Sequence, residues 1–330
     1  MPPASSATTP STLVRLYDVA APAPGTAGHT ARPARRTDVS GALSLVADGT
    51  AAELIRLAFA SDPVRAAVTV RDGKVLGCCL YDATGKGTVG PLHTAPGADE
   101  SLRPDLLRSA CRAMLRAGYW YAVTEGAALA DCPALVPEAA VPVPGVLPPQ
   151  PGLRDVPGPW ADLFLPLGEE LDQEAPDRFL AGTRTVHIVR PRASDRITLI
   201  RWVAEQFGDG WAGEVEAAFD RQPVSVLFAS DSGRLDRPEA LLGLAAWGVS
   251  ALGMTGPTAL SPSARGSHIA MVLMDRCLRE LRRDGYAYAI LGGFGRRRGA
   301  LLALTEAWAI PGSYPALFPR DPQEGAAADD

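Results

Sequence analysis

The chain has 330 residues, a formal net charge of −5 and 47% hydrophobic residues. This length is long for one hydrophobic core and comfortable for two. The negative charge weighs against non-specific nucleic-acid binding, because that affinity comes mainly from cations that neutralise phosphates. Composition therefore indicates a globular protein with two cores.

The two ends have a different composition from the rest of the chain. Residues 1–12 are rich in Pro, Ala and Ser, and residues 321–330 are rich in Ala and acid, so we expect a disordered tail at each end. The start has neither the basic nor the apolar region of a signal peptide, and the longest mostly apolar run, 240–254, is too short to span a bilayer. We therefore expect a cytoplasmic protein without a membrane partner.

The first half contains a hairpin followed by a helix. The dipeptide Asp72-Gly73 is typical of a tight turn between two strands. A helix is predicted over 104–117, where Pro104 suits the first turn and apolar residues recur on one side. A strand follows at 119–123.

The second half repeats this order after a proline-rich stretch at 142–160. Strands are predicted at 163–167, 185–189, 225–230 and 240–249, and helices from the N-cap Ser194-Asp195 to 206 and over 211–221. The clearest amphipathic helix covers 267–284, and a strand at 286–291 follows it.

An internal repeat relates the two halves. Residues 118–145 and 285–312 align without a gap and are identical at nine positions, including both Gly-Tyr starts and both Pro-Gly ends. Farther upstream, Gly90-Pro91 aligns with Gly256-Pro257. A repeat of about half the chain predicts two copies of one domain, 13–150 and 151–320, each α/β with a mixed twisted sheet flanked by helices.

The five cysteines form no recognisable pattern. Cys78 and Cys79 are adjacent, no CxxC spacing occurs, and the number is odd. We therefore predict neither a disulfide framework nor a metal site, and interpret the cysteines as small buried hydrophobic residues.

The loop 262–270 joins a predicted strand to the helix 267–284. Free N–H groups and the positive end of the helix dipole at such a point suit a pyrophosphate. The run Arg265-Gly266-Ser267-His268-Ile269-Ala270 resembles the Q/R-x-x-G-x-G/A loop of the GNAT acyltransferases. The helix that ends in Gly-Tyr and leads into Tyr-Ala-Ile is also similar to the core of that family.

Two features depart from the pattern of this family. His268 stands where the family has Gly, and we expect its backbone N–H rather than its ring to serve the loop. In the first half, residues 97–102 carry Asp99 and Glu100 where a pyrophosphate would lie, which is unfavourable. The resemblance therefore implies a tandem GNAT, the architecture of mycothiol synthase, packed as a pseudo-dimer with a degenerate first copy and a donor site in the second.

The resemblance also implies how a donor would bind and react. The pantetheine arm of an acyl-CoA, for instance acetyl-CoA, would pair with the strand at 256–260, including Thr258 and Leu260, and a backbone N–H there would stabilise the oxyanion. A base would deprotonate the acceptor amine, and a Tyr would protonate the leaving thiolate. The usual Tyr is absent from 295–302, so Tyr314 becomes the candidate acid.

Acceptor contacts in the family come from the first two helices. The candidates here are Glu205 and Asp209 as bases, with Trp211 and Glu214 as substrate contacts. For each of these residues, an ordinary role as a cap, a surface acid or a core aromatic residue is an equally good interpretation.

Eight arginines lie between Arg265 and Arg298 against three acidic residues, which predicts a basic face. Arg296, Arg297 and Arg298 either begin a solvated helix or contact a phosphate-rich donor. That donor would be acyl-CoA or the acceptor end of an aminoacyl-tRNA, and a non-catalytic scaffold is a third alternative. The expected reaction is amide formation on a small-molecule amine by a monomer or weak dimer.

Overall fold

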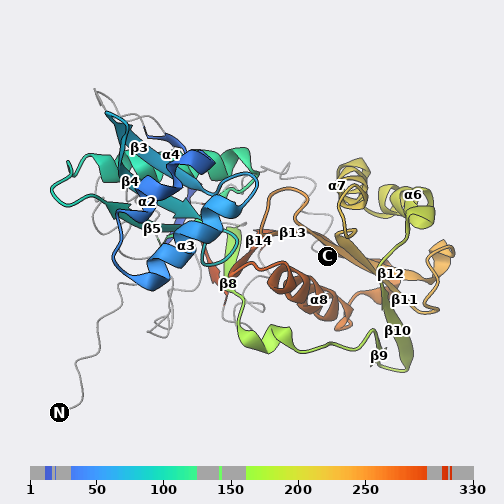
Figure 1. Ribbon diagram of the computed structural model, residues 1–330. Coiled ribbons are helices and arrows are strands. Elements are labelled where there is room, and N and C mark those ends of the chain that lie inside the picture. The colour runs from blue at the N-terminus through green and yellow to red at the C-terminus, as the bar shows by residue number, and fades with distance from the viewer. Residues whose placement is uncertain are drawn as a thin grey trace, which may run out of the picture. The chain divides into compact units, whose positions relative to one another are not determined.

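The computed structural model describes residues 12–16, 19, 31–124, 141–142, 161–295, 307–310 and 313. The chain divides into two compact units, Met1–Arg154 and Asp155–Asp330. Each unit contains one sheet with parallel and antiparallel pairs and helices against it (Figure 1). The α/β class with two mixed sheets, expected from the repeat, is confirmed.

The first unit has a sheet of order β2-β3-β4-β5-β6-β1-β7. Its strands are β1 (Thr12–Arg15), β2 (Arg32–Pro33), β3 (Ala66–Arg71), β4 (Lys74–Tyr81), β5 (Thr88–Thr94), β6 (Tyr121–Thr124) and β7 (Val141–Pro142). Its helices are the 3-10 helix η1 (Arg36–Asp38) and the α-helices α2 (Val39–Leu43), α3 (Gly49–Ala60) and α4 (Leu102–Arg116).

The second unit has a sheet of order β15-β8-β14-β13-β12-β11-β10-β9. Its strands are β8 (Ala161–Pro166), β9 (Arg178–Ala181), β10 (Arg184–Val189), β11 (Val226–Ser230), β12 (Leu241–Trp247), β13 (Met254–Leu260), β14 (Tyr288–Phe294) and β15 (Trp308–Ala309). The α-helices are α6 (Arg196–Phe207), α7 (Asp209–Phe219) and α8 (Ile269–Arg283), and the 3-10 helices are η3 (Glu169–Asp172), η4 (Ala193–Asp195), η5 (Pro238–Ala240) and η6 (Pro262–Ala264).

The two sheets share one topology. In each unit the first strand lies antiparallel between the last two strands: β1 between β6 and β7, and β8 between β14 and β15. The single parallel pair also recurs, as β5 with β6 and β13 with β14. The sequence missed β1, because its closest pairing partners lie more than a hundred residues away and a four-residue strand has little periodicity of its own.

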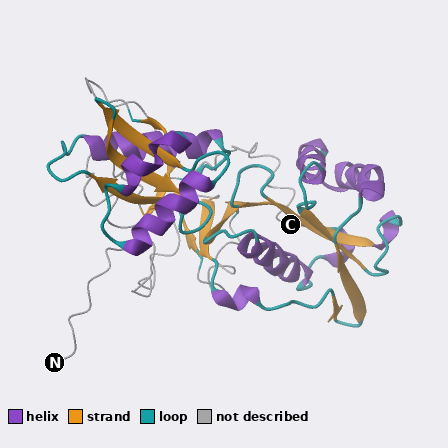
Figure 2. Cartoon of the chain, in the orientation of Figure 1, coloured by secondary structure: helices purple, strands orange, loops and turns teal. Residues whose placement is uncertain are grey.

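Helices cover both faces of the second sheet. Residues of α6 and α7 form one core with β11 and β12, and α8 packs on the opposite face (Figures 1 and 2). The helix α6 begins at Arg196 with Asp195 at its N-cap, as expected, but the Asp195 carboxylate accepts the Arg192 N–H at 2.8 Å instead of a helical amide. Asp195 thus closes the turn of η4 and makes no side-chain cap on α6.

The hairpin turn between β3 and β4 has the expected geometry. Asp72 has φ of 50° and Gly73 has φ of 74°, the left-handed values that a tight two-residue turn requires. The equivalent connection between β11 and β12 covers ten residues, 231–240, and includes η5. The tighter turn in the first half is therefore confirmed.

The strand β8 carries much of the packing at its end of the second sheet. Phe164 is 1% exposed, and its ring lies 5.3 Å from Tyr288 and 4.5 Å from Trp308, centroid to centroid. We predict that Phe164→Ala lowers the free energy of unfolding of the second unit by about 3–5 kcal/mol, because it removes a buried ring and leaves a cavity. Urea unfolding followed by tryptophan fluorescence measures this, and Leu180→Ala, at a 64% exposed side chain, should change little.

Four of the cysteines, Cys78, Cys79, Cys111 and Cys277, are buried free thiols, as the sequence analysis expected. Burial raises the pKa of Cys78 to about 12 and that of Cys111 to about 12. The fifth, Cys132, lies outside the described residues. We predict that these four thiols do not react with Ellman's reagent at pH 8 until the protein is unfolded, so native reaction of more than one thiol would contradict the described burial.

Candidate functional site

The strands β13 and β14 separate after two residue pairs. Met254 pairs with Ile290 and Thr255 with Leu291, and β13 continues to Leu260 without a further partner on that side among the described residues. Gly256 and Pro257 mark the separation, because both lie opposite the single residue Ala246 of β12 and form a bulge. A bulge bends its strand, and Pro has no N–H to donate.

The first unit contains the same bulge. Gly90 and Pro91 of β5 lie opposite the single residue Leu80 of β4, and among the described residues β5 pairs with β6 at Thr88 and Val89. The repeated Gly-Pro of the sequence therefore marks a bulge in each copy, and in the second copy it marks the point where a strand edge becomes available. An exposed edge of this kind can pair with an extended, amide-containing ligand.

The loop after β13 presents several backbone N–H groups. Gly266 has φ of 76°, and the Ser267 hydroxyl donates to the Ala264 carbonyl at 2.6 Å and accepts the Ile269 N–H at 3.4 Å. Five further backbone N–H groups have no hydrogen-bond acceptor within the described part of the chain. They belong to Gly266, Ser267, His268, Ala270 and Met271. Such a set at the start of a 15-residue helix suits an anion.

The matching loop of the first unit uses its amides internally. The Asp99 carboxylate accepts the Ser101 N–H at 2.9 Å, and the Asp99 carbonyl accepts the Leu102 N–H at 3.0 Å. The Ala98 and Arg103 amides also donate to carbonyls of the loop. A cleft of about 370 Å³ lies against this loop, and its lining carries charges of both signs: Arg71, Lys74, Asp72 and Asp99. The described lining therefore lacks the net positive charge that a pyrophosphate needs, and the amides of Ser101, Leu102 and Arg103 at the start of α4 are already hydrogen-bonded.

His268, the residue that departs from the family pattern, contacts the edge strand β9. Its ring lies against the Phe179 ring of β9, with centroids 5.4 Å apart and planes tilted by 51°. Ring contact with β9 holds the imidazole at the side of the loop. The backbone N–H of His268 remains available there.

The other predicted donor contacts occupy the strand and the loop. Thr258 and Leu260 lie on the separated part of β13, and the Thr258 hydroxyl is buried without a hydrogen-bond partner in the described chain. Arg265 is exposed, while Ile269 is buried under the first turn of α8 and Ala270 is half-buried beside it. The structure therefore brings the predicted donor residues to one end of β13.

The predicted acceptor residues lie on α6 and α7. Glu205 and Asp209 are exposed, and Glu214 is half-buried. The centroids of the Trp211 and Phe207 rings lie 5.7 Å apart, and Trp211 packs against the core formed by α6, α7, β11 and β12. Trp211 thus has the packing role that the sequence analysis left open. The remaining predicted residues, Tyr314 and Arg296 to Arg298, lie outside the described residues.

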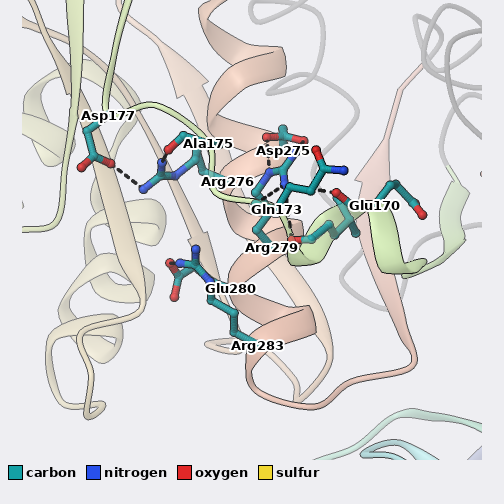
Figure 3. Close-up of polar contacts among 10 residues, drawn as sticks. Glu170, Gln173, Ala175, Asp177, Asp275, Arg276, Arg279, Glu280 and Arg283 are labelled. Atoms are coloured by element: carbon teal, nitrogen blue, oxygen red, sulfur yellow. Dashed lines mark hydrogen bonds and ion pairs between the residues drawn. The ribbon is translucent and has the colours of Figure 1, made fainter.

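The basic face expected from α8 is largely neutralised. Arg276, Arg279 and Arg282, one helical turn apart, hydrogen-bond to the segment 167–177 that leads from β8 to β9. Figure 3 shows the contacts of Arg276 and Arg279. Every described arginine of α8 is ion-paired: Arg276 with Asp177, Arg279 with Asp275, Arg282 with Asp172 and Arg283 with Glu280. Four of the eight arginines of the expected basic face therefore have acidic partners: Asp172 and Asp177 lie on the segment 167–177, and Asp275 and Glu280 lie on α8 itself.

Two residues of this region were missed from the sequence. Asp162 on β8 is 1% exposed, and its carboxylate accepts the Gly293 N–H at 2.9 Å near the end of β14. An acidic residue within the apolar run of β8 was a usable signal. Phe179 carried no signal, since its role depends on the fold alone.

Among the described residues, no helix is long and apolar enough to cross a membrane. The same residues include no group of three or more His, Cys, Asp or Glu side chains placed to hold a metal ion.

The segment 167–177 gives a stability prediction. The Arg279 guanidinium donates to the carbonyls of Leu171 at 3.3 Å and Gln173 at 2.5 Å, so Arg279→Ala should lower the free energy of unfolding by about 1–3 kcal/mol. Arg283→Ala is the matched control, because Arg283 is itself 46% exposed and Glu280 keeps its ion pair with Arg190 at 2.7 Å, so the loss should be less than about 1 kcal/mol. Urea unfolding tests both variants, and equal losses would contradict the assigned role.

No protein-family model matches the sequence, and no curated protein matches it. Solved structures are similar over most of the chain. A GCN5-related N-acetyltransferase from Sphaerobacter thermophilus is 17% identical, with a TM-score of 0.33 over 82% of this chain and 88% of that one. A tandem GNAT protein from the clavulanic acid biosynthesis pathway is 15% identical, with a TM-score of 0.35 over 86% and 95%. A GNAT-family acetyltransferase from Colwellia psychrerythraea is 11% identical, with a TM-score of 0.30 over 83% and 90%.

These similarities concern the arrangement of helices and strands.

Proposed function

We propose that the protein is an acyltransferase that forms an amide on a small-molecule amine, with acyl-CoA bound by the second unit. The observation that supports this is the contrast between the two loops. The first loop binds the amides of Ser101, Leu102 and Arg103 at the start of its helix and carries Asp99, whereas the second leaves the amides of Gly266 to His268 open. Two copies of one fold thus differ where an anionic donor would bind.

The chemistry follows from the open strand edge and the loop. In this proposal the pyrophosphate of acyl-CoA lies on the loop amides, and its pantetheine amides pair with β13 between Gly256 and Leu260. The free amine of the acceptor attacks the thioester carbonyl, a backbone N–H of β13 stabilises the oxyanion, and the C–S bond then breaks. The acceptor ammonium first loses one proton to a base and becomes the free amine. Its nitrogen loses a second proton as the amide forms, and the departing thiolate gains one, so that one proton is released overall.

The proton carriers are proposed from the sequence candidates. Glu205 or Asp209, exposed at the junction of α6 and α7, takes the proton of the acceptor ammonium, with Trp211 and Glu214 contacting the acceptor. Tyr314 donates to the thiolate. The proposed boundaries of the working domain are residues 151 and 320, and the protein acts as a cytoplasmic monomer.

An aminoacyl-tRNA donor is the second candidate. The run Arg296-Arg297-Arg298 favours it, since successive cations suit a phosphate backbone. The ion-paired arginines of α8 reduce the charge available to a long polyanion, so the smaller acyl-CoA is the better-supported donor.

The duplication provides a matched test of the donor site. Gly266 and Gly97 have φ of 76° and 71°, and a methyl group at either would meet no described atom within 4 Å. The Ala variants therefore suffer similar backbone strain of about 1–2 kcal/mol. We predict that Gly266→Ala weakens acetyl-CoA binding about tenfold, because the loop must change shape, whereas Gly97→Ala leaves it unchanged. Isothermal titration calorimetry measures both affinities.

Equal weakening by the two glycine variants would place the donor elsewhere. A wild-type protein that does not bind acetyl-CoA at millimolar concentration but retains charged tRNA in a gel-shift assay would favour the second donor. Release of free thiol from acetyl-CoA in the presence of a panel of amines then tests turnover. If neither donor binds, the protein is a non-catalytic scaffold.

A further inference from the structure

The edge strand β9 contacts the loop at the start of α8. The Phe179 ring of β9 and the His268 ring have centroids 5.4 Å apart and are tilted by 51°. Aromatic pairs in this range of separation attract each other, and a tilted arrangement is among the favoured ones. His268 directly precedes α8, among the open amides of the loop.

The conformation of the His268 side chain bears on anion binding, because His268 lies among the open amides of the loop. Its side chain is exposed, so its rotamer is not fixed by burial in a core. In another staggered rotamer the imidazole would compete for the space in front of the loop amides, where an anion would bind. Contact with Phe179 restrains the ring to the rotamer in which the two rings meet.

The position of Phe179 is fixed from two directions. On β9 it pairs with Val186 of β10, which is buried. Just before β9, Arg276 of α8 donates to the Ala175 carbonyl and to the Asp177 carboxylate, the latter at 2.7 Å (Figure 3). Because α8 carries Arg276 and also begins at the loop, one rigid helix holds both partners of the ring contact.

We propose that Phe179 is a positioning residue for the donor site: it holds the His268 ring beside the loop and keeps the loop amides accessible to the anionic part of the donor. This inference rests on the proposed function of the second unit. It assigns to β9 a role in donor affinity.

The test is a double-mutant cycle with acetyl-CoA as the ligand, measured by isothermal titration calorimetry on the full chain. Phe179→Ala should weaken binding about three- to tenfold, the range expected for loss of an aromatic pair that selects one rotamer. His268→Ala should bind at least as tightly as the wild type. Phe179→Ala/His268→Ala should return to the affinity of His268→Ala, because no imidazole remains to be held aside.

The control is Leu180→Ala on the same strand. Successive side chains of a strand point to opposite faces, and Leu180 is 64% exposed, so this variant should bind acetyl-CoA like the wild type. Thermal unfolding of each variant checks the fold. A general loss of structure would lower the affinity of the double variant at least as much as that of Phe179→Ala, so rescue distinguishes positioning from stability.

The outcomes separate the inference from the proposed function. If the wild type binds acetyl-CoA and Phe179→Ala binds equally tightly, the inference is overturned and the proposed function stands. Failure of the double variant to recover would also overturn it. A wild type that does not bind acetyl-CoA overturns the acyl-CoA donor and the positioning role together.

Discussion

The candidate site depends on one backbone feature, the bulge at Gly256-Pro257. Two residues of β13 oppose the single Ala246 of β12, and the parallel pairing with β14 stops just before them. Since Pro257 lacks an N–H, the strand cannot resume regular pairing there. The separated edge of β13 begins at this change of register, and the strand then leads into the loop before α8.

Duplication supplies an internal control for what the site requires. Both units keep the bulge, the parallel pair and the first strand inserted between the last two. They differ in the loop, where Asp99 caps the first copy and Ser267 leaves most amides of the second copy open. Shared features are therefore attributable to folding, and the loop is where the hydrogen bonding of the two copies differs.

The arginines of α8 in the second unit contribute mainly to the fold. Arg276, Arg279 and Arg282 face the segment 167–177 and bind its carbonyls and carboxylates, and this anchors β9 beside the loop. These arginines were counted as part of a surface for phosphate, but their guanidinium groups are occupied by the segment 167–177. Their effect on the site is therefore indirect. It passes through the position of Phe179 beside His268.

The sequence by itself determined the duplication, the α/β class, the hairpin turn at Asp72-Gly73 and the loop before α8, because these depend on local periodicity and turn chemistry. Only the tertiary structure decided the place of β1 and β8, the partners of the α8 arginines and the contact of Phe179 with His268. Each of these joins residues far apart in the chain, so no local pattern records it. The Gly-Pro repeat lies between the two cases: the sequence showed its position, and strand pairing showed that it opens the sheet.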